Sequence, residues 1–275
     1  LYQWGAMQVH ASEFAVRTFD CGKDGRLKLN VLMQYLQEAA AQHAERLGVG
    51  FVDLDRVGGF WVLVNLRMAI AAMPRWRDTV LVETWPSGWT RSTASREFVV
   101  RTPEGAGCVR AGSEWMILDR QSGRPRNLRR MELGLPSDAP KALDVEPHRL
   151  RVSDDYAQAH RLHVPFSSLD FNGHVNNTEY VRWAMDGLHE ALGELPAIRS
   201  AQMTFLAEAF AGDEIEVAVG REDASLHVLE RRARRRTDRP VPHGSWRLAG
   251  PRHIEKGHEP PCSQPHVPIL ATRPR

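Results

Sequence analysis

Cysteine is scarce in this chain of 275 residues, since it occurs three times, at positions 21, 108 and 262. An odd number of widely spaced cysteines without a Cys-x-x-Cys pair argues against a disulfide framework and fits a reducing compartment, so we expect a cytoplasmic protein. Long apolar runs are also missing, because no window approaches the roughly 18 apolar residues of a membrane span. Neither a signal peptide nor a transit peptide is recognisable.

An excess of one charge is the third feature that the sequence lacks. Lys and Arg together number 36 and Asp and Glu 34, which leaves a net charge of +2. This balance is too weakly basic to indicate nucleic-acid binding. The composition, 42% hydrophobic and 25% charged, is that of an ordinary globular protein with enough apolar residues for a sizeable core.

Hydrophobic periodicity predicts the same order of elements twice. Apolar residues three or four apart predict helices over 31–47 and 177–192, and each helix follows a strand-like segment, 13–21 or 160–170. Alternating apolar and polar residues predict the remaining strands. They cover 59–70, 78–89, 92–102 and 107–119 in the first half, and 198–210, 213–222, 225–233 and 241–249 in the second.

The two halves also align with each other, which indicates an internal duplication. The helical segments within 27–39 and 174–186 face each other at an offset of about 145, Asp78 aligns with Asp213, and Trp115 aligns with Trp246. A long helix lying on an antiparallel sheet is an α+β layer, so we predict two such units in tandem.

Changes in composition predict the domain limits. We expect an N-terminal domain over 7–122, a proline-rich linker over 123–147 and a C-terminal domain over 148–250. Residues 251–275 hold six prolines and no apolar periodicity, so we expect a disordered tail. Residues 1–6 precede the first methionine and are expected to lie outside the fold.

Polar side chains crowd the segment before the second helix. Asp170, Asn172 and His174 stand at alternate positions, and in an extended chain they would project to one side. A carboxylate can orient an imidazole and stabilise its charged form, while an amide can hold water or a carbonyl oxygen without titrating. Together these groups can activate water against an acyl carbon.

The start of the second helix adds another feature. Asn176 is a suitable N-cap, with Glu179 three residues on as its reciprocal partner. The N–H groups and partial positive charge of a helix N-terminus suit an oxyanion that develops on a polarised carbonyl. The segment therefore combines a candidate base with a candidate oxyanion site.

An elaborate helix cap is the alternative to an active site, because Asp and Asn are common before helices. In the aligned first half, the positions of the polar trio hold Gly25, Leu27 and Leu29. The first helix is thus preceded by no such trio, and capping alone does not require one.

The stretch DFNGHVNNTEYVRW, residues 170–183, resembles the D-x-N-x-H-V-N-N-x-x-Y-x-x-W signature of acyl-acyl-carrier-protein thioesterases, a double-hotdog family. Residues 75–100 and 113–125 and the first predicted helix are similar to the first hotdog of that family, and the resemblance covers about 14–250. It implies a tandem double hotdog, in which each unit is a long central helix wrapped by an antiparallel sheet and the first unit shapes the acyl pocket.

The resemblance also implies hydrolysis of fatty acyl thioesters carried by acyl carrier protein, with Asp170, Asn172 and His174 as catalytic residues. A further catalytic glutamate of the family falls on Glu208, although FLAEA stands here in place of the family's Y-R-R-E-C and Ala209 in place of its cysteine. Water is then the nucleophile, assisted by His174 and either Glu208 or Asp170, and no metal or organic cofactor is implied. Acyl carrier protein is the implied partner, while a homodimer and a monomer both stay open.

Other interpretations also stay open. An acyl-coenzyme A thioesterase would use the same residues, whereas a hotdog hydratase or a non-catalytic acyl-binding module fits the compact signature less well. The arginines of 231–236 and the RPRNLRR segment at 124–130 are candidate docking sites for an acidic carrier, but a solvated hairpin explains 231–236 better. His258, Cys262 and His266 have spacings that a metal accepts, but chance is the better explanation in a proline-rich tail.

Overall fold

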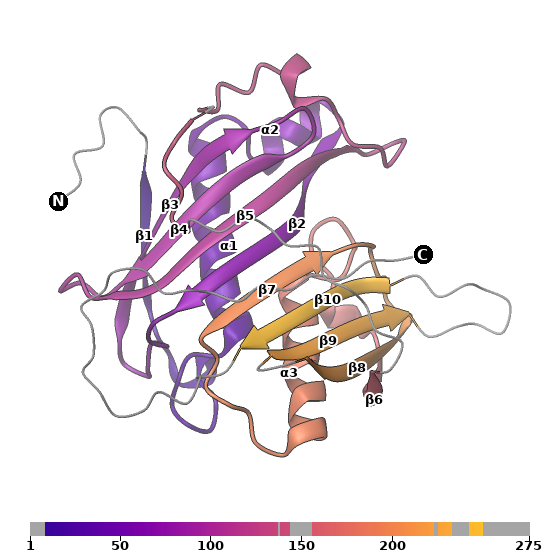
Figure 1. The fold of residues 1–275 in the computed structure, drawn as a ribbon. Helices are drawn as coiled ribbons and strands as arrows, with labels where there is room; N and C mark the ends of the chain where they lie inside the picture. The colour runs from indigo at the N-terminus through magenta and orange to yellow at the C-terminus, as the bar shows by residue number, and fades with distance from the viewer. Residues whose placement is uncertain (1–8, 137, 144–155, 223–224, 233–241, 250–275) are drawn as a thin grey trace, which may run out of the picture. The chain divides into compact units, whose positions relative to one another are not determined.

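The chain forms two compact units, Leu1–Asp144 and Val145–Arg275, each of them a helix on an antiparallel sheet (Figure 1). This is the α+β arrangement that the duplicated pattern predicts. The computed structural model describes residues 9–136, 138–143, 156–222 and 225–232, and the backbone of 242–249. The predicted leader, 1–6, and the predicted tail, 251–275, lie outside the described residues.

In the described part of the first unit, five strands follow the order β1-β3-β4-β5-β2, and every neighbouring pair is antiparallel. The strands are β1 (His10–Ala15), β2 (Gly59–Ile70), β3 (Thr79–Trp89), β4 (Ala94–Arg101) and β5 (Gly107–Asp119), and the helices are η1 (Thr18–Asp20), α1 (Leu29–Arg46), α2 (Phe51–Arg56) and η2 (Leu128–Arg130). Helix α1 packs against β1 and β3. Its buried face includes Leu32, Leu36 and Ala39 at helical spacing, and β3 contributes Val80 and Val82 by alternation.

The second unit repeats this plan. Its strands are β6 (Ala157–His163), β7 (Ser200–Phe205), β8 (Glu214–Glu222), β9 (Ser225–Arg232) and β10 (Pro242–Ala249), and its helices are η3 (Phe166–Ser168) and α3 (Asn177–Leu192). The strand order is β6-β8-β9-β10-β7, again antiparallel throughout. Helix α3 packs closely on β8. The closeness is seen at Gly187, where an added Cβ atom would lie 2.6 Å from Cγ1 of Val217.

Most predicted elements are present, and the exceptions have physical reasons. Helix α3 has the predicted bounds, and α1 ends at Arg46, shortly before Gly48 takes a φ of 70°. The periodicity does not predict α2, because six residues are too few to show a helical repeat. Gly50, which follows α1 shortly after Gly48, is the N-cap of α2.

The strand orders confirm the duplication but correct the alignment of the turn before each helix. In the first unit Gly25 has a φ of 72° and donates its N–H to Gly22 O at 3.0 Å. In the second unit Gly173 has a φ of 78° and donates to Asp170 O, also at 3.0 Å. The first-unit equivalents of Asp170, Asn172 and His174 are therefore Gly22, Asp24 and Arg26. Our sequence alignment of the trio with Gly25, Leu27 and Leu29 is wrong, because helical periodicity tolerates a slip of three residues.

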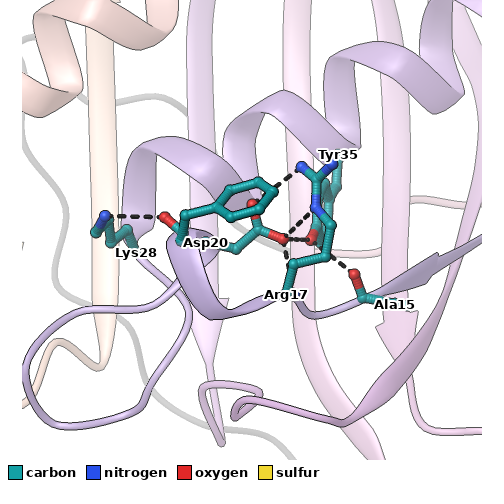
Figure 2. Close-up of polar contacts among 6 residues, drawn as sticks. Ala15, Arg17, Asp20, Lys28 and Tyr35 are labelled. Atoms are coloured by element: carbon teal, nitrogen blue, oxygen red, sulfur yellow. Dashed lines mark hydrogen bonds and ion pairs between the residues drawn. The ribbon is translucent and has the colours of Figure 1, made fainter.

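A buried carboxylate anchors this turn to α1 in the first unit. Figure 2 shows Asp20 of η1 between Arg17 and Tyr35. The Tyr35 hydroxyl donates to Asp20 Oδ2 at 2.8 Å, and Arg17 donates to the same atom from its backbone N and from Nε, both at 2.9 Å. The Lys28 ammonium donates to Phe19 O at 3.0 Å and closes the loop from the other side. The entry into α1 is thus held by side-chain hydrogen bonds.

The described part of the predicted linker, 123–136 and 138–143, packs on the first unit. Leu128 lies in an apolar cluster with Leu54, Ala94 and Ile117. Farther along, Trp85 Nε1 donates to Pro140 O at 2.8 Å, and the N–H of Ala142 donates to Glu97 Oε2 at 3.0 Å. These bonds tie the segment to strands β3 and β4.

Candidate active site

The polar trio of the signature, Asp170, Asn172 and His174, lies in a tight turn between η3 and α3. Asp170 N–H donates to His174 O at 2.8 Å, and an isolated bridge joins Leu169 and Val175 around this turn. The prediction that Asp170, Asn172 and His174 project together from an extended chain is therefore wrong. The positive φ of Gly173 folds the segment back on itself, a backbone conformation that glycine adopts readily.

The Asp170 carboxylate faces the backbone of this turn. Its Oδ1 accepts the N–H of Asn172 at 2.8 Å and the N–H of His174 at 3.3 Å. Such a side-chain-to-backbone bond two residues ahead is the usual behaviour of Asp at a turn. Asp170 thus shapes the loop that carries the amide and the imidazole.

The carboxylate beside the imidazole is that of Glu208. His174 Nδ1 and Glu208 Oε1 are 3.3 Å apart, with side-chain exposures of 22% and 39%. Glu208 lies in the loop after β7, and the N–H of Val175 donates to Ala209 O at 2.9 Å, which fastens that loop to the turn. The structure thus brings together two predicted site residues that lie on separate loops.

An aromatic ring that the sequence reasoning missed completes this arrangement. The Phe210 ring meets the His174 imidazole edge to face, with centroids 5.2 Å apart and planes at 89°. Phe210 is held by its own loop, where its N–H donates to Asp213 Oδ2 at 3.0 Å. Its place two residues after Glu208 is the one sequence signal for it.

The cap of α3 is confirmed in part. Asn176 Oδ1 accepts the N–H of Thr178 at 2.9 Å, so Asn176 is the N-cap as predicted. Glu179 is not its reciprocal partner, because Glu179 Oε2 accepts the Ser168 hydroxyl at 2.8 Å and the Arg182 guanidinium. The Asn176 N–H donates instead to Ser168 O at 2.9 Å.

The equivalent turn of the first unit has the same backbone and different chemistry. The N–H of Leu27 donates to Pro74 O at 2.8 Å, as that of Val175 does to Ala209 O, so Met73 stands at the place of Glu208. With Arg26 at the place of His174, this turn has no acid–imidazole pair.

Among the described residues, the other candidates from the sequence do not gather into a site. Arg231 and Arg232 form ion pairs within the second unit, with Glu216 at 3.0 Å and Asp213 at 3.4 Å, while the arginines at 234–236 lie outside the described residues. The three tail residues His258, Cys262 and His266 lie outside them as well. Within the described part, no three His, Cys, Asp or Glu residues are grouped to hold a metal ion, and no helix is long and apolar enough to cross a membrane.

Comparison with known families identifies the chain. The sequence model of the acyl-ACP thioesterase N-terminal domain matches residues 7–131, and that of the C-terminal domain matches residues 152–238. The chain belongs to the acyl-ACP thioesterase family. The second matched segment includes the turn with His174 and the loop with Glu208.

Curated acyl-ACP thioesterases are similar in sequence but longer. The palmitoyl-acyl carrier protein thioesterase of Gossypium hirsutum is 27% identical over 212 residues, which are 72% of this chain and 50% of that protein. The dodecanoyl-[acyl-carrier-protein] hydrolase of Cinnamomum camphora is 28% identical over 240 residues, 79% of this chain and 62% of that one. The chain therefore spans about half to three fifths of the length of these relatives.

Solved structures confirm the fold. An acyl-ACP thioesterase from Bacteroides thetaiotaomicron superposes with a TM-score of 0.78 at 24% identity, covering 88% of this chain and 97% of that one. The 12:0-ACP thioesterase from Umbellularia californica superposes with a TM-score of 0.76 at 23% identity, covering 88% and 96%. The predicted double hotdog is confirmed by these acyl-ACP thioesterase structures.

Proposed function

We propose that the chain hydrolyses fatty acyl thioesters of acyl carrier protein to a free fatty acid and the carrier thiol. The observation that carries this proposal is the 3.3 Å contact between His174 Nδ1 and Glu208 Oε1, directly before α3, in a chain of the acyl-ACP thioesterase family. The relatives from Gossypium hirsutum and Cinnamomum camphora are named for this activity. The carrier protein is the partner that the proposal requires.

In the proposed mechanism, Glu208 accepts the Nδ1 proton of His174 in a hydrogen bond and leaves Nε2 as the base. Nε2 takes a proton from water as the water oxygen attacks the thioester carbon. Asn172 holds the water or the thioester, and the partial positive charge at the N-terminus of α3 stabilises the oxyanion. Collapse of the tetrahedral intermediate breaks the carbon–sulfur bond, and the leaving thiolate takes the proton from His174.

Hydrolysis assays with matched variants test this proposal. His174→Ala and Glu208→Gln are expected to lower kcat/KM for acyl-carrier thioesters by about 10²–10⁴-fold and 10²-fold, the usual range for loss of general acid–base catalysis. Arg26→Ala, at the equivalent place in the first unit, is the control and should keep the wild-type rate. The site assignment fails if folded His174→Ala and Glu208→Gln proteins stay fully active.

Alternative substrates are measured in the same assay. If the wild type hydrolyses acyl-coenzyme A and ignores the acyl carrier thioester, the carrier assignment is wrong. If it hydrates a 2-enoyl thioester without cleaving it, the reaction class is wrong. The proposal also includes two domains, 7–122 and 148–250, and a cytoplasmic location. The small number and wide spacing of the three cysteines support that location.

A further inference from the structure

We propose that Asp170 is a positioning residue, whose carboxylate fixes the backbone that presents Asn172 and His174 and exchanges no proton in the reaction. This inference rests on the proposed function, because it divides the roles within the same site. It departs from the sequence prediction, in which Asp170 is an alternative to Glu208 as the base.

The contacts of the carboxylate carry the first step. A single oxygen, Oδ1, accepts two backbone N–H groups, from Asn172 at 2.8 Å and from His174 at 3.3 Å. The backbone of Asp170 closes the same turn, because its N–H donates to His174 O at 2.8 Å and its C=O accepts from Gly173 at 3.0 Å. Each of these bonds fixes the main chain from which the amide and the imidazole project.

The equivalent turn of the first unit supplies the second step. There Asp24 stands at the place of Asn172, and its Oδ1 accepts the N–H of Arg26 at 3.0 Å. Arg26 stands at the place of His174, so the same backbone N–H is bound in both units by a different side chain. In the second unit Asp170 has taken over this bond, and the residue at position 172 is not needed for it.

This exchange has a consequence for the site. A side chain that closes the turn must fold back on its own backbone, as Asp24 does. Because Asp170 supplies the acceptor, the turn does not require the Asn172 side chain to fold back on the backbone. The imidazole obtains its carboxylate from Glu208, 3.3 Å from Nδ1, so no chemical step requires the charge of Asp170.

An amide oxygen can accept the same two N–H groups, and Asn forms such turns as readily as Asp. Asp170→Asn should therefore retain kcat/KM within about fivefold of wild type, since only the strengthening by charge is lost. Asp170→Ala removes the acceptor and should lower kcat/KM about 100-fold, the effect expected from a small displacement of a reacting group. Asp24→Ala removes the matching bond in the first unit and should leave kcat/KM unchanged.

The readouts are kcat and KM with an acyl-carrier thioester, the pH dependence of kcat/KM, and thermal unfolding of each variant. Rescue by Asp170→Asn, with the same apparent pKa values in the pH profile as wild type, supports positioning. Loss of activity in folded Asp170→Asn equal to that in His174→Ala overturns it, and so does full activity of Asp170→Ala. If Asp170→Ala does not fold, Asp170→Asn alone decides. A wild type without hydrolase activity refutes the proposed function instead.

Discussion

The buried Asp20 gives the sharpest stability prediction, because its partners are few and well defined. Its side chain is 3% exposed and accepts from Tyr35 Oη at 2.8 Å and from Arg17 Nε at 2.9 Å. Asp20→Ala removes the acceptor, and Tyr35→Phe removes the buried donor. Ala15 O lies 3.3 Å from Tyr35 Oη, so the single hydroxyl proton has an alternative acceptor when Asp20 is lost.

The expected loss in the free energy of unfolding follows from how exposed each partner of Asp20 is. A hydrogen bond to a charged group is worth about 1.5–3 kcal/mol, and the buried bond from Tyr35 counts in full. The Arg17 side chain is 59% exposed, so its ion pair is screened and adds at most about 1 kcal/mol. Asp20→Ala should therefore lower the free energy of unfolding by about 2–4 kcal/mol. The double-mutant cycle with Tyr35→Phe should give a coupling energy of about 1–2 kcal/mol.

The contribution of Asp20 to the free energy of unfolding depends on pH, and the sign of this dependence can be derived. Burial by itself would raise the pKa of Asp20, but hydrogen bonds from Arg17 and Tyr35 outweigh burial and hold the pKa below its usual value. Because the folded pKa lies below that of the unfolded chain, about 3.9, ionised Asp20 stabilises the protein fully above about pH 5. This contribution is lost as the pH falls through the folded pKa. The difference between wild type and Asp20→Ala should thus shrink between pH 7 and pH 3.5.

Urea denaturation followed by circular dichroism and tryptophan fluorescence measures both quantities. The four proteins of the cycle are compared at pH 7, and wild type and Asp20→Ala are compared again at pH 3.5. A coupling energy below about 0.3 kcal/mol would show that the Tyr35 contact contributes nothing. A wild-type advantage that grows on acidification would refute the sign of the argument.

Two further predictions concern glycines. Gly173→Ala and Gly25→Ala both place a side chain at positive φ with open space around the new Cβ, so each should lower the free energy of unfolding by about 1–2 kcal/mol. The value of kcat/KM should fall only in Gly173→Ala, because His174 and Glu208 lie in the second unit. Equal kinetic losses in both variants would contradict the proposed placement of the site. Gly187→Ala should destabilise by about 1–3 kcal/mol although alanine favours helices, because its Cβ meets Val217 Cγ1 at 2.6 Å. In a Val217→Ala background the same change should be at least about 1 kcal/mol milder, and an equal effect in both backgrounds would exclude this clash as the cause.

The elements of the fold can be predicted from the sequence wherever periodicity extends over many residues. Helix α3 has the predicted bounds because Asn176 caps it and its apolar face runs through four turns. Helix α2 is too short for this signal. The proline-rich segment 123–143 has no period, yet Trp85 and Glu97 hold it on the first unit through its backbone groups, which a sequence pattern does not reveal.

The composition of the candidate site is more predictable than its geometry. The signature includes His174, and the resemblance points to Glu208, but only the folded chain relates them. The bond from Val175 N–H to Ala209 O sets the distance between their loops. The arrangement of Asp170, Asn172 and His174 could not be predicted from their spacing. Alternate positions share a face only in an extended strand, and the positive φ of Gly173 means that this segment is not extended.

The two turns together explain how one copy of a duplicated fold can be specialised for chemistry. In the first unit the buried Asp20 ties the turn to Tyr35 of α1, whereas Ser168 occupies the equivalent place in the second unit and donates to Glu179 of α3. Both solutions hold the helix entry, but the second uses a neutral hydroxyl two residues before Asp170. The turn that carries His174 therefore has its acidic groups at positions where they bind backbone N–H groups or the imidazole. We expect Ser168→Asp to lower both the free energy of unfolding and kcat/KM, because it places a second carboxylate in a buried position beside Glu179. Thermal unfolding and the hydrolysis assay measure the two losses, and unchanged values of both would contradict this account.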